Sequence, residues 1–211
     1  MKSKGKFITF EGIDGCGKST QVQMLADHLK STGYEVVVVR EPGGTQVGEA
    51  IRKILLSVEL TPCIETELLL YLASRAQLSR QIILPALKEG KLVIADRYAD
   101  SSTVYQGYVR GIGMEKVKEL NAFATSGLVP DITFILDIPV EVAVERMKRK
   151  SKDRLEREGE RFLERAREGY IRLANGEPER FFVIDAQQNP EDTFREILLH
   201  LKERGVTYFH H

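Results

Sequence analysis

The sequence has no net charge, few cysteines and no long apolar run. Its 31 basic and 31 acidic residues balance, which excludes the broadly charged surface typical of proteins that bind nucleic acids or membranes. The two cysteines, Cys16 and Cys63, are too few for a disulfide framework, and the four histidines lack the spacing of metal ligands. Any affinity for anions must therefore come from a particular site rather than from the overall charge of the protein.

Apolar runs are short throughout, as in "VVVV" at 36–39, and residues 1–10 contain no long apolar segment followed by a cleavage site. We therefore expect a cytoplasmic protein with no membrane partner and no nucleic-acid partner. With 211 residues, 42% hydrophobic and 29% charged, the chain has the composition of an ordinary globule, and we expect a single domain over 1–211.

Short β-rich apolar runs recur along the chain, at 6–10, 35–39, 92–96, 132–137 and 180–185. The segments between them have helical periodicity, for example at Val22, Leu25 and Leu29. Strands that are apolar throughout and alternate with helices predict a parallel sheet buried on both faces, a doubly wound α/β fold. A ligand is then expected at the carboxyl ends of the strands, in the loops after residues 10, 39, 96 and 137.

The loop after the first expected strand, "FEGIDGCGKST" at 10–20, contains the pattern G-x-x-x-x-G-K-[ST]. Gly12 and Gly17 allow the backbone to turn its N–H groups inward, and the following helix adds its partial positive charge. Lys18 is expected to reach the β- and γ-phosphates of a nucleotide, and Ser19 to place a hydroxyl on Mg²⁺. One residue is unexpected in an anion-binding loop, the acidic Asp14.

Two other segments carry candidate site residues. Asp96 and Arg97 follow the third expected strand, where they can hold a magnesium water and a phosphate; a local salt bridge is the alternative. Tyr71 and Arg75 share one face of an expected helix over 68–77, where a role in the core is the alternative.

Together these motifs resemble the bacterial thymidylate kinase family, nucleoside monophosphate kinases with a phosphate loop. The resemblance runs through "REPGGT" at 40–45, "DRYADSSTVYQG" at 96–107, "PDITFILDIPVEVAVER" at 130–146, "KDRLE" at 152–156 and "IDAQQ" at 184–188. It implies a five-stranded sheet with helices on both faces. It also implies transfer of the γ-phosphoryl group of ATP to dTMP, dependence on Mg²⁺, and a homodimer.

The resemblance also implies roles for individual residues. ATP would be bound by Gly12, Ile13, Asp14, Gly15, Cys16, Gly17, Lys18, Ser19, Thr20, Arg149 and Arg154. Arg52 and Arg97 would hold the dTMP phosphate, Tyr71 would stack on thymine, and Arg75 would donate to its O4. Ser102 and Gln106 would contact the base edge, Tyr105 would exclude a 2′-hydroxyl, and Glu41 would support phosphate and magnesium geometry before a cis bond to Pro42.

Asp14 then gains an expected role, because the resemblance assigns it to the 3′-hydroxyl of dTMP, a hydrogen-bond donor that needs an acceptor. Its side chain would point away from the ATP phosphates and toward the second substrate. A loop-stabilising aspartate bonded to nearby backbone is the alternative.

The segment Arg146–Arg167 is strongly basic, with ten Lys or Arg against five Asp or Glu. Alone it would be interpreted as a solvated helix with i,i+4 ion pairs. Some members of the family carry an arginine in the phosphate loop, where this chain has Gly15. The resemblance therefore places the catalytic arginine at Arg149, or at Arg154, in a short basic lid over 146–161.

The expected catalytic residues are Lys18, Arg97, Arg149 and Asp14, and no general base is required, since the acceptor is already an anion. Two other functions were considered. Another nucleoside monophosphate or deoxynucleoside kinase would share the scaffold and differ in the base pocket. A nucleotide-dependent switch is disfavoured because the chain lacks the N-K-x-D signature of guanine-specific switches.

Overall fold

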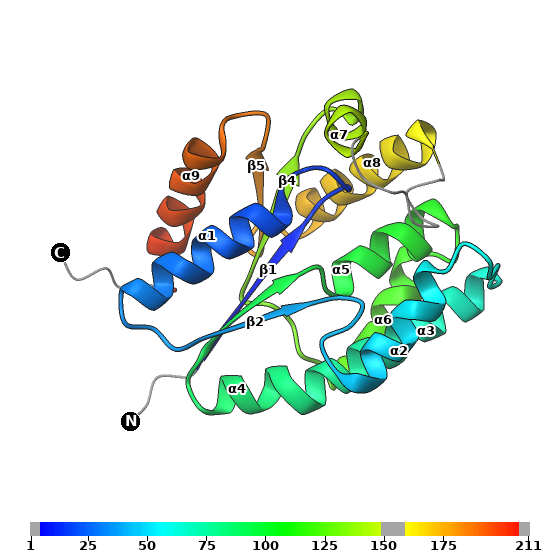
Figure 1. Ribbon diagram of the computed structural model, residues 1–211, viewed down its shortest axis with the longest axis horizontal. Helices are drawn as coiled ribbons and strands as arrows, with labels where there is room; N and C mark the ends of the chain where they lie inside the picture. Colours follow the sequence, from blue (N-terminus) through cyan, green and yellow to red (C-terminus); the bar gives the residue numbers. More distant parts are fainter. Residues whose placement is uncertain (1–4, 149–158, 207–211) are drawn as a thin grey trace.

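The structure, a computed structural model, describes residues 5–148 and 159–206. Within them five strands form one parallel sheet in the order β2-β3-β1-β4-β5 (Figure 1). The strands are β1 (Lys6–Glu11), β2 (Val36–Arg40), β3 (Leu92–Asp96), β4 (Ile132–Asp137) and β5 (Phe181–Asp185). The doubly wound parallel sheet predicted from the apolar runs is confirmed, with each strand displaced by no more than one residue.

Helices cover both faces of the sheet. They are α1 (Lys18–Ser31), α2 (Gln46–Leu56), α3 (Ile64–Leu78), α4 (Leu84–Lys88), α5 (Ala99–Ser102), α6 (Met114–Thr125), α7 (Val140–Met147), α8 (Glu160–Gly176) and α9 (Pro190–Glu203). Figure 1 shows α1 and α9 together on one face, whereas α4 and α8 pack on the other. Two π-helical segments, η1 (Ser79–Ile83) and η2 (Thr103–Val109), were not expected from the periodicity.

Strand β1 sends alternate side chains to opposite faces of the sheet. Ile8 and Phe10 pack in the hydrophobic cluster that contains Leu25 of α1. Phe7 packs on the other face, against the α4 side, and Glu11 lies on the same face as Phe7. Glu11 is thereby placed beneath the loop that follows β3.

The strand register aligns the carboxyl ends where the site was expected. Asp96, the last residue of β3, lies beside Phe10 of β1 and Arg40 of β2. The loops leaving these three strands therefore meet at one edge of the sheet.

The segment expected to form a lid, 146–161, is described only at its ends. Arg146 and Met147 close α7, Glu160 and Arg161 open α8, and Gly159 precedes α8 with φ of 90°. Residues 149–158, with Arg149 and Arg154, lie outside the described residues.

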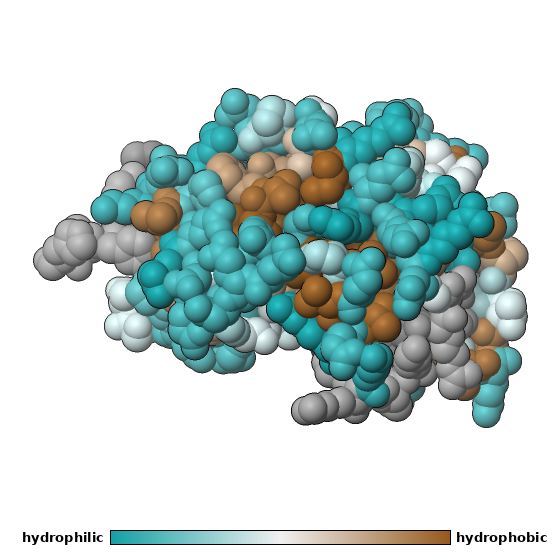
Figure 2. Space-filling model, turned by 90° about the horizontal axis from the view of Figure 1, so that it is seen from above, coloured by the Kyte–Doolittle hydropathy of each residue, from teal (hydrophilic) through white to brown (hydrophobic). Residues whose placement is uncertain are grey.

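Seen from above, the molecule is mostly hydrophilic, with a central group of hydrophobic side chains (Figure 2). Among the residues that the structure describes, no helix is both long and apolar enough to cross a membrane.

Candidate active site

The phosphate loop connects β1 to α1 and depends on glycine at three positions. Gly12, Gly15 and Gly17 have φ of 132°, 83° and 100°, values that side chains with a Cβ rarely adopt. A Cβ on Gly12 would lie 2.6 Å from the carbonyl oxygen of Leu136, and one on Gly15 would lie 2.6 Å from that of Ala143. The loop therefore packs closely on β4 and α7, and position 15 has no room for an arginine.

Lys18 folds back over this loop. Its Nζ donates to the carbonyl oxygens of Gly12 at 3.1 Å and Ile13 at 2.9 Å, and it lies 3.6 Å from the Cys16 sulfur. The first N–H groups of a helix have no carbonyl partner within that helix, so the start of α1 presents donors and positive charge to the same space. The loop can thus bind an anion through both backbone and Lys18.

Ser19 and Asp96, the two predicted magnesium ligands, lie together. The Ser19 hydroxyl donates to Asp96 Oδ2 at 2.6 Å, although the two residues are 77 positions apart. Hydroxyl, carboxylate and phosphate oxygens are ligands suited to Mg²⁺. Among the described residues no group of three or more His, Cys, Asp or Glu side chains could hold a metal ion, so this pair fits a metal shared with phosphates and water.

Asp14 reaches across to Arg97. Arg97 Nη2 donates to Asp14 Oδ1 at 2.6 Å, so the carboxylate points toward the loop after β3. Arg97 itself has φ of 70°, a strained conformation for a residue other than glycine. The loop aspartate is therefore held beside a cation that the resemblance assigns to the acceptor phosphate.

Beneath Arg97 lies a buried acid that the sequence analysis missed, Glu11. It accepts hydrogen bonds from the Tyr98 amide at 2.7 Å, the Ser101 hydroxyl at 2.6 Å and the Tyr170 hydroxyl at 3.0 Å. Burial and the nearby Asp100 raise the pKa of Glu11. The one available signal was an acidic residue ending an otherwise apolar strand.

Arg97 is oriented by the same group. Its Nη1 lies within hydrogen-bond distance of the Gly12 carbonyl, the Ser101 hydroxyl and the Tyr170 hydroxyl, at 3.0, 3.1 and 3.1 Å. Tyr170 comes from α8, so the helix after the basic segment helps to fix a predicted catalytic side chain.

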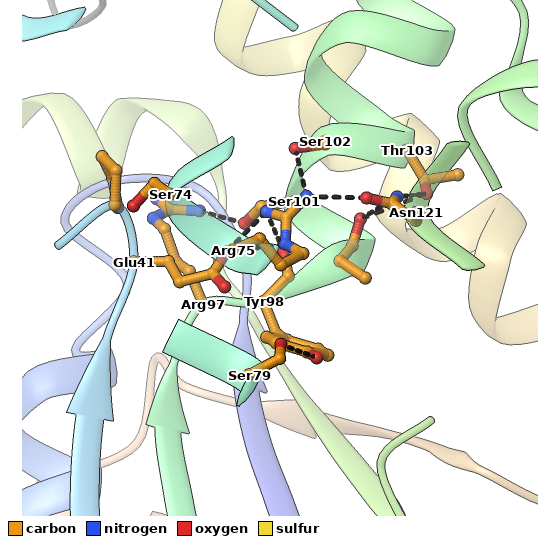
Figure 3. Close-up of polar contacts among 12 residues, drawn as sticks. Glu41, Ser74, Arg75, Ser79, Arg97, Tyr98, Ser101, Ser102, Thr103 and Asn121 are labelled. Carbon is orange, nitrogen blue, oxygen red and sulfur yellow. Dashed lines mark hydrogen bonds and ion pairs between the residues drawn. The ribbon is translucent and has the colours of Figure 1, made fainter. Parts of the chain in front are cut away.

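Arg75 of α3 is completely buried, and Figure 3 shows the side chains that surround it. Nε donates to Glu41 Oε2 at 2.8 Å, Nη2 forms an ion pair with the same oxygen at 2.6 Å, and Nη2 also donates to the Tyr98 carbonyl at 3.0 Å. Nη1 donates to Ser102 at 3.0 Å and to Asn121 at 2.7 Å. These contacts engage all three guanidinium nitrogens, so a bond to a nucleotide base would compete with them.

Glu41 is the buried carboxylate at the centre of this arrangement. No group in the described part of the chain forms a hydrogen bond with its Oε1. Its Oε2, in contrast, contacts both Nε and Nη2 of Arg75. Burial raises the pKa of Glu41 to about 7, although Arg75 opposes that rise. The Glu41–Pro42 peptide bond is cis, as expected, and Arg52 donates to the Pro42 carbonyl at 2.9 Å.

The wall nearest to α3 carries the predicted base-binding residues. The Tyr105 ring stacks on Phe162 with centroids 5.7 Å apart, and burial raises the pKa of the Tyr105 hydroxyl. Gln106 donates to Glu67, a buried carboxylate that the sequence analysis did not identify.

These residues surround one cavity of about 680 Å³, large enough for small-molecule ligands. The predicted residues that line it are Asp14, Gly15, Cys16, Gly17, Lys18, Ser19, Thr20, Glu41, Arg52, Tyr71, Asp96, Arg97, Ser102, Tyr105 and Gln106. Gly12 and Ile13 contribute carbonyls that hold Lys18, and Arg75 lies behind the wall. Arg149 and Arg154 lie outside the described residues.

At the other end of the cavity, Arg146 joins α7 to the loop after β5. Its Nη2 donates to the Ala186 carbonyl at 3.1 Å, and its Nη1 lies 3.5 Å from the Gly15 carbonyl. Arg146 was expected only as part of the basic segment. Its position beyond the phosphate loop suits contact with the donor nucleotide.

Comparison with known proteins finds similar sequences over nearly the whole chain. The thymidylate kinase family model matches residues 10–197. A thymidylate kinase of Caldanaerobacter subterraneus subsp. tengcongensis is 57% identical over 185 residues, 88% of this chain and 89% of that protein. One of Fervidobacterium nodosum is 54% identical over 192 residues, 91% of this chain and 96% of its own length.

A solved structure is also similar. The crystal structure of thymidylate kinase from Ehrlichia chaffeensis superposes with a TM-score of 0.78 at 34% identity, covering 94% of this chain and 99% of that one. The chain therefore belongs to the thymidylate kinase family and catalyses the ATP-dependent phosphorylation of dTMP.

Proposed function

We propose that ATP and dTMP enter the cavity from opposite ends and meet between Asp14 and Arg97. The observation that carries this proposal is the 2.6 Å contact from Arg97 Nη2 to Asp14 Oδ1, because it joins the phosphate loop to the loop after β3. An acceptor phosphate on Arg97 would thereby lie next to phosphates held by the loop.

The donor end is assigned to Gly12–Thr20 and to arginines beyond the loop. The ATP phosphates would take the place of the carbonyl groups that Lys18 now contacts, and the N–H groups at the start of α1 would complete their binding. Arg146 would approach the nucleotide from α7. Arg149, with Arg154 as a second candidate, would supply positive charge to the transferred group from the basic segment over 146–161, whose role as a lid is inferred from the sequence.

The acceptor end is assigned to side chains around Arg75. Arg97 and Arg52 would bind the dTMP phosphate, and Asp14 would accept a hydrogen bond from the 3′-hydroxyl. Thymine would stack on Tyr71, with Ser102 and Gln106 at its edge and Tyr105 against the sugar; all of these line the cavity. Arg75 would donate to O4 of thymine by giving up one of its present hydrogen bonds, and Glu41 would hold the Arg75 guanidinium in place.

The chain needs little covalent chemistry of its own for this reaction. Both substrates are phosphate anions, so the barrier falls when cations surround the moving phosphoryl group and the two substrates are held in line. Lys18, Arg97 and Arg149 are the cations proposed for this task. No group is needed to remove a proton from the acceptor phosphate.

Mg²⁺ is proposed as the cofactor, held by the Ser19 hydroxyl and, directly or through water, by Asp96. The 2.6 Å contact between these two oxygen ligands at the mouth of the loop supports the assignment. When bound, the ion would neutralise part of the negative charge on the donor phosphates.

We also propose that the protein is a homodimer that uses the face formed by α2, α3 and α6. Phe123 of α6 is 87% exposed and Leu69 of α3 is 60% exposed, and α3 packs against both α2 and α6. Phe123→Glu should shift the sedimentation coefficient to that of a monomer. Leu199→Glu on α9, where the leucine is 61% exposed, is the matched control and should leave it unchanged.

The remaining assignments concern the chain as a whole. We propose that residues 1–211 form one kinase domain, because the elements from β1 to α9 pack around a shared sheet. A cytoplasmic location is proposed because Cys16 and Cys63 are free thiols, as is usual in a reducing compartment.

Asp14→Asn tests the central assignment. The amide keeps the size of the side chain but removes the charge, so we expect kcat/KM for dTMP to fall by about tenfold or more while the KM for ATP changes less than about twofold. Asp27→Asn, on the exposed face of α1, is the matched control and should leave both constants unchanged. A higher KM for ATP together with an unchanged kcat/KM for dTMP would show that Asp14 does not act on the acceptor side.

A further inference from the structure

Gln106 is held from behind by a buried carboxylate, Glu67 of α3. Gln106 Nε2 donates to Glu67 Oε1 at 2.8 Å, and both residues are 2% exposed. The two residues are 39 positions apart and belong to different elements, η2 and α3. The contact therefore fixes how the Gln106 side chain is presented to the cavity that it lines.

The Glu67 carboxylate has a cation on its other side. Arg110 Nη2 lies 3.4 Å from Glu67 Oε2, and the Arg110 guanidinium carbon lies 5.1 Å from the centroid of Phe162. Arg110 and Gln106 both present N–H groups to this carboxylate, whose oxygens accept hydrogen bonds, so its contact with Gln106 requires the donating end of the amide.

This requirement determines which end of the Gln106 amide faces the cavity. A primary amide has one donating end, Nε2, and one accepting end, Oε1. Since Nε2 is engaged by Glu67, Oε1 is left for the cavity. No donor within residues 5–148 and 159–206 bonds Oε1.

We propose that Glu67 is a positioning residue that sets the preference of the enzyme among pyrimidine bases. By holding Gln106 Oε1 toward the cavity, it provides an acceptor for the N3–H group of a 4-oxopyrimidine such as thymine. Cytosine has a lone pair at N3 instead of a hydrogen, so Gln106 Oε1 would repel this lone pair and disfavour cytosine. This proposal rests on the placement of the base beside Gln106 proposed above.

Glu67→Gln is the direct test. A glutamine at 67 offers both a donor and an acceptor, so Gln106 can rotate and present Nε2, which suits cytosine. We expect the ratio of kcat/KM for dCMP to kcat/KM for dTMP to rise by about tenfold, mainly through lower use of dTMP. Glu65→Gln, on the same helix with an exposed side chain, is the control and should leave the ratio unchanged. An unchanged ratio in a Glu67→Gln protein that melts as a folded enzyme would overturn the proposal.

A second variant covers the case in which Glu67→Gln does not fold. Arg110→Met removes the guanidinium that lies 3.4 Å from Glu67 Oε2 while leaving Glu67 in place, so the carboxylate loses that contact and holds Gln106 less firmly. The dCMP to dTMP ratio should rise in the same direction, but by less than in Glu67→Gln. A ratio equal to that of the wild type would overturn the role of Glu67.

Gln106→Leu separates this inference from the proposed function. If Gln106→Leu leaves the KM for dTMP unchanged, the base does not contact Gln106, and the assignment of the base pocket is wrong. If Gln106→Leu raises that KM but Glu67→Gln leaves the acceptor ratio unchanged, the base pocket stands and the role of Glu67 is wrong.

Discussion

The two ends of the cavity are built in different ways. The phosphate loop is local: glycines at positive φ shape it, and Lys18 bonds carbonyl groups only five or six residues away. The acceptor end is assembled from distant side chains, since Arg75 of α3 bonds Glu41 after β2, Ser102 of α5 and Asn121 of α6.

Because of this difference, residues at one end affect mainly substrate binding, whereas residues at the other also affect the stability of the fold. A loop built from backbone can exchange its internal contacts for phosphates with little effect on the rest of the molecule. A buried guanidinium with all three nitrogens engaged is part of the core, and its removal leaves acceptors without partners. The acceptor end should therefore be coupled to global stability, whereas the donor end should not.

Arg75→Ala should produce the largest effect. The change strands the buried Glu41 carboxylate and removes donors from Ser102 and Asn121, so we expect the free energy of unfolding to fall by about 5 kcal/mol. Lys18→Ala should abolish activity but lower the free energy of unfolding by at most about 1 kcal/mol. Urea unfolding of both variants measures the contrast, and equal losses would contradict it.

Arg149→Ala comes next and tests the donor end. Because Gly15 has no space for a side chain, the proposed arginine would have to come from outside the loop. We expect kcat to fall by about 10³-fold, equivalent to about 4 kcal/mol, with little change in the binding of dTMP. Arg154→Ala, assayed in parallel, distinguishes the two candidates, and near wild-type turnover of Arg149→Ala would remove that residue from the mechanism.

The smallest of the three effects concerns pH and Glu41. Folding raises the pKa of this carboxyl from 4.5 to about 7, so the folded protein holds the proton more tightly. The resulting stabilisation is complete below about pH 4.5 and is lost as the pH rises through about 7. With about 1.4 kcal/mol per pH unit between these values, the loss is about 3 kcal/mol.

The measurement is urea unfolding at pH 5 and pH 8. The wild type should lose about 2.5 kcal/mol more between these pH values than Glu41→Gln, which cannot ionise at this position. Glu65→Gln, where the glutamate is exposed, should follow the wild type. Parallel pH profiles for the wild type and Glu41→Gln would show that Glu41 does not titrate in this range.

The sequence predicted the sheet well, and it located the loop between β1 and α1, because both are encoded locally. Apolar runs marked the five strands within one residue, and a short motif marked the phosphate loop. The pairing of Ser19 with Asp96 also followed, since the carboxyl ends of parallel strands meet at one edge.

The supporting residues could not be predicted in the same way. Tyr170 bonds Glu11 across 159 positions, and Gln106 bonds Glu67 across 39, so neither pair has a spacing signature. Arg75 was expected to contact a base, and the structure surrounds it with four protein partners, Glu41, Tyr98, Ser102 and Asn121. The π-helical path of η2, which carries Tyr105 and Gln106, also has no counterpart in a 3.6-residue pattern.

The close approach of α7 to the phosphate loop also limits how this enzyme could change. A Cβ at position 15 would meet the Ala143 carbonyl at 2.6 Å, and backbone cannot move aside as the end of a flexible side chain can. Transplanting an arginine into the loop would therefore require α7 to shift in the same step. The two placements of the arginine that the family resemblance implies are thus separated by a packing barrier, and we expect that a single substitution at Gly15 would not convert one arrangement into the other.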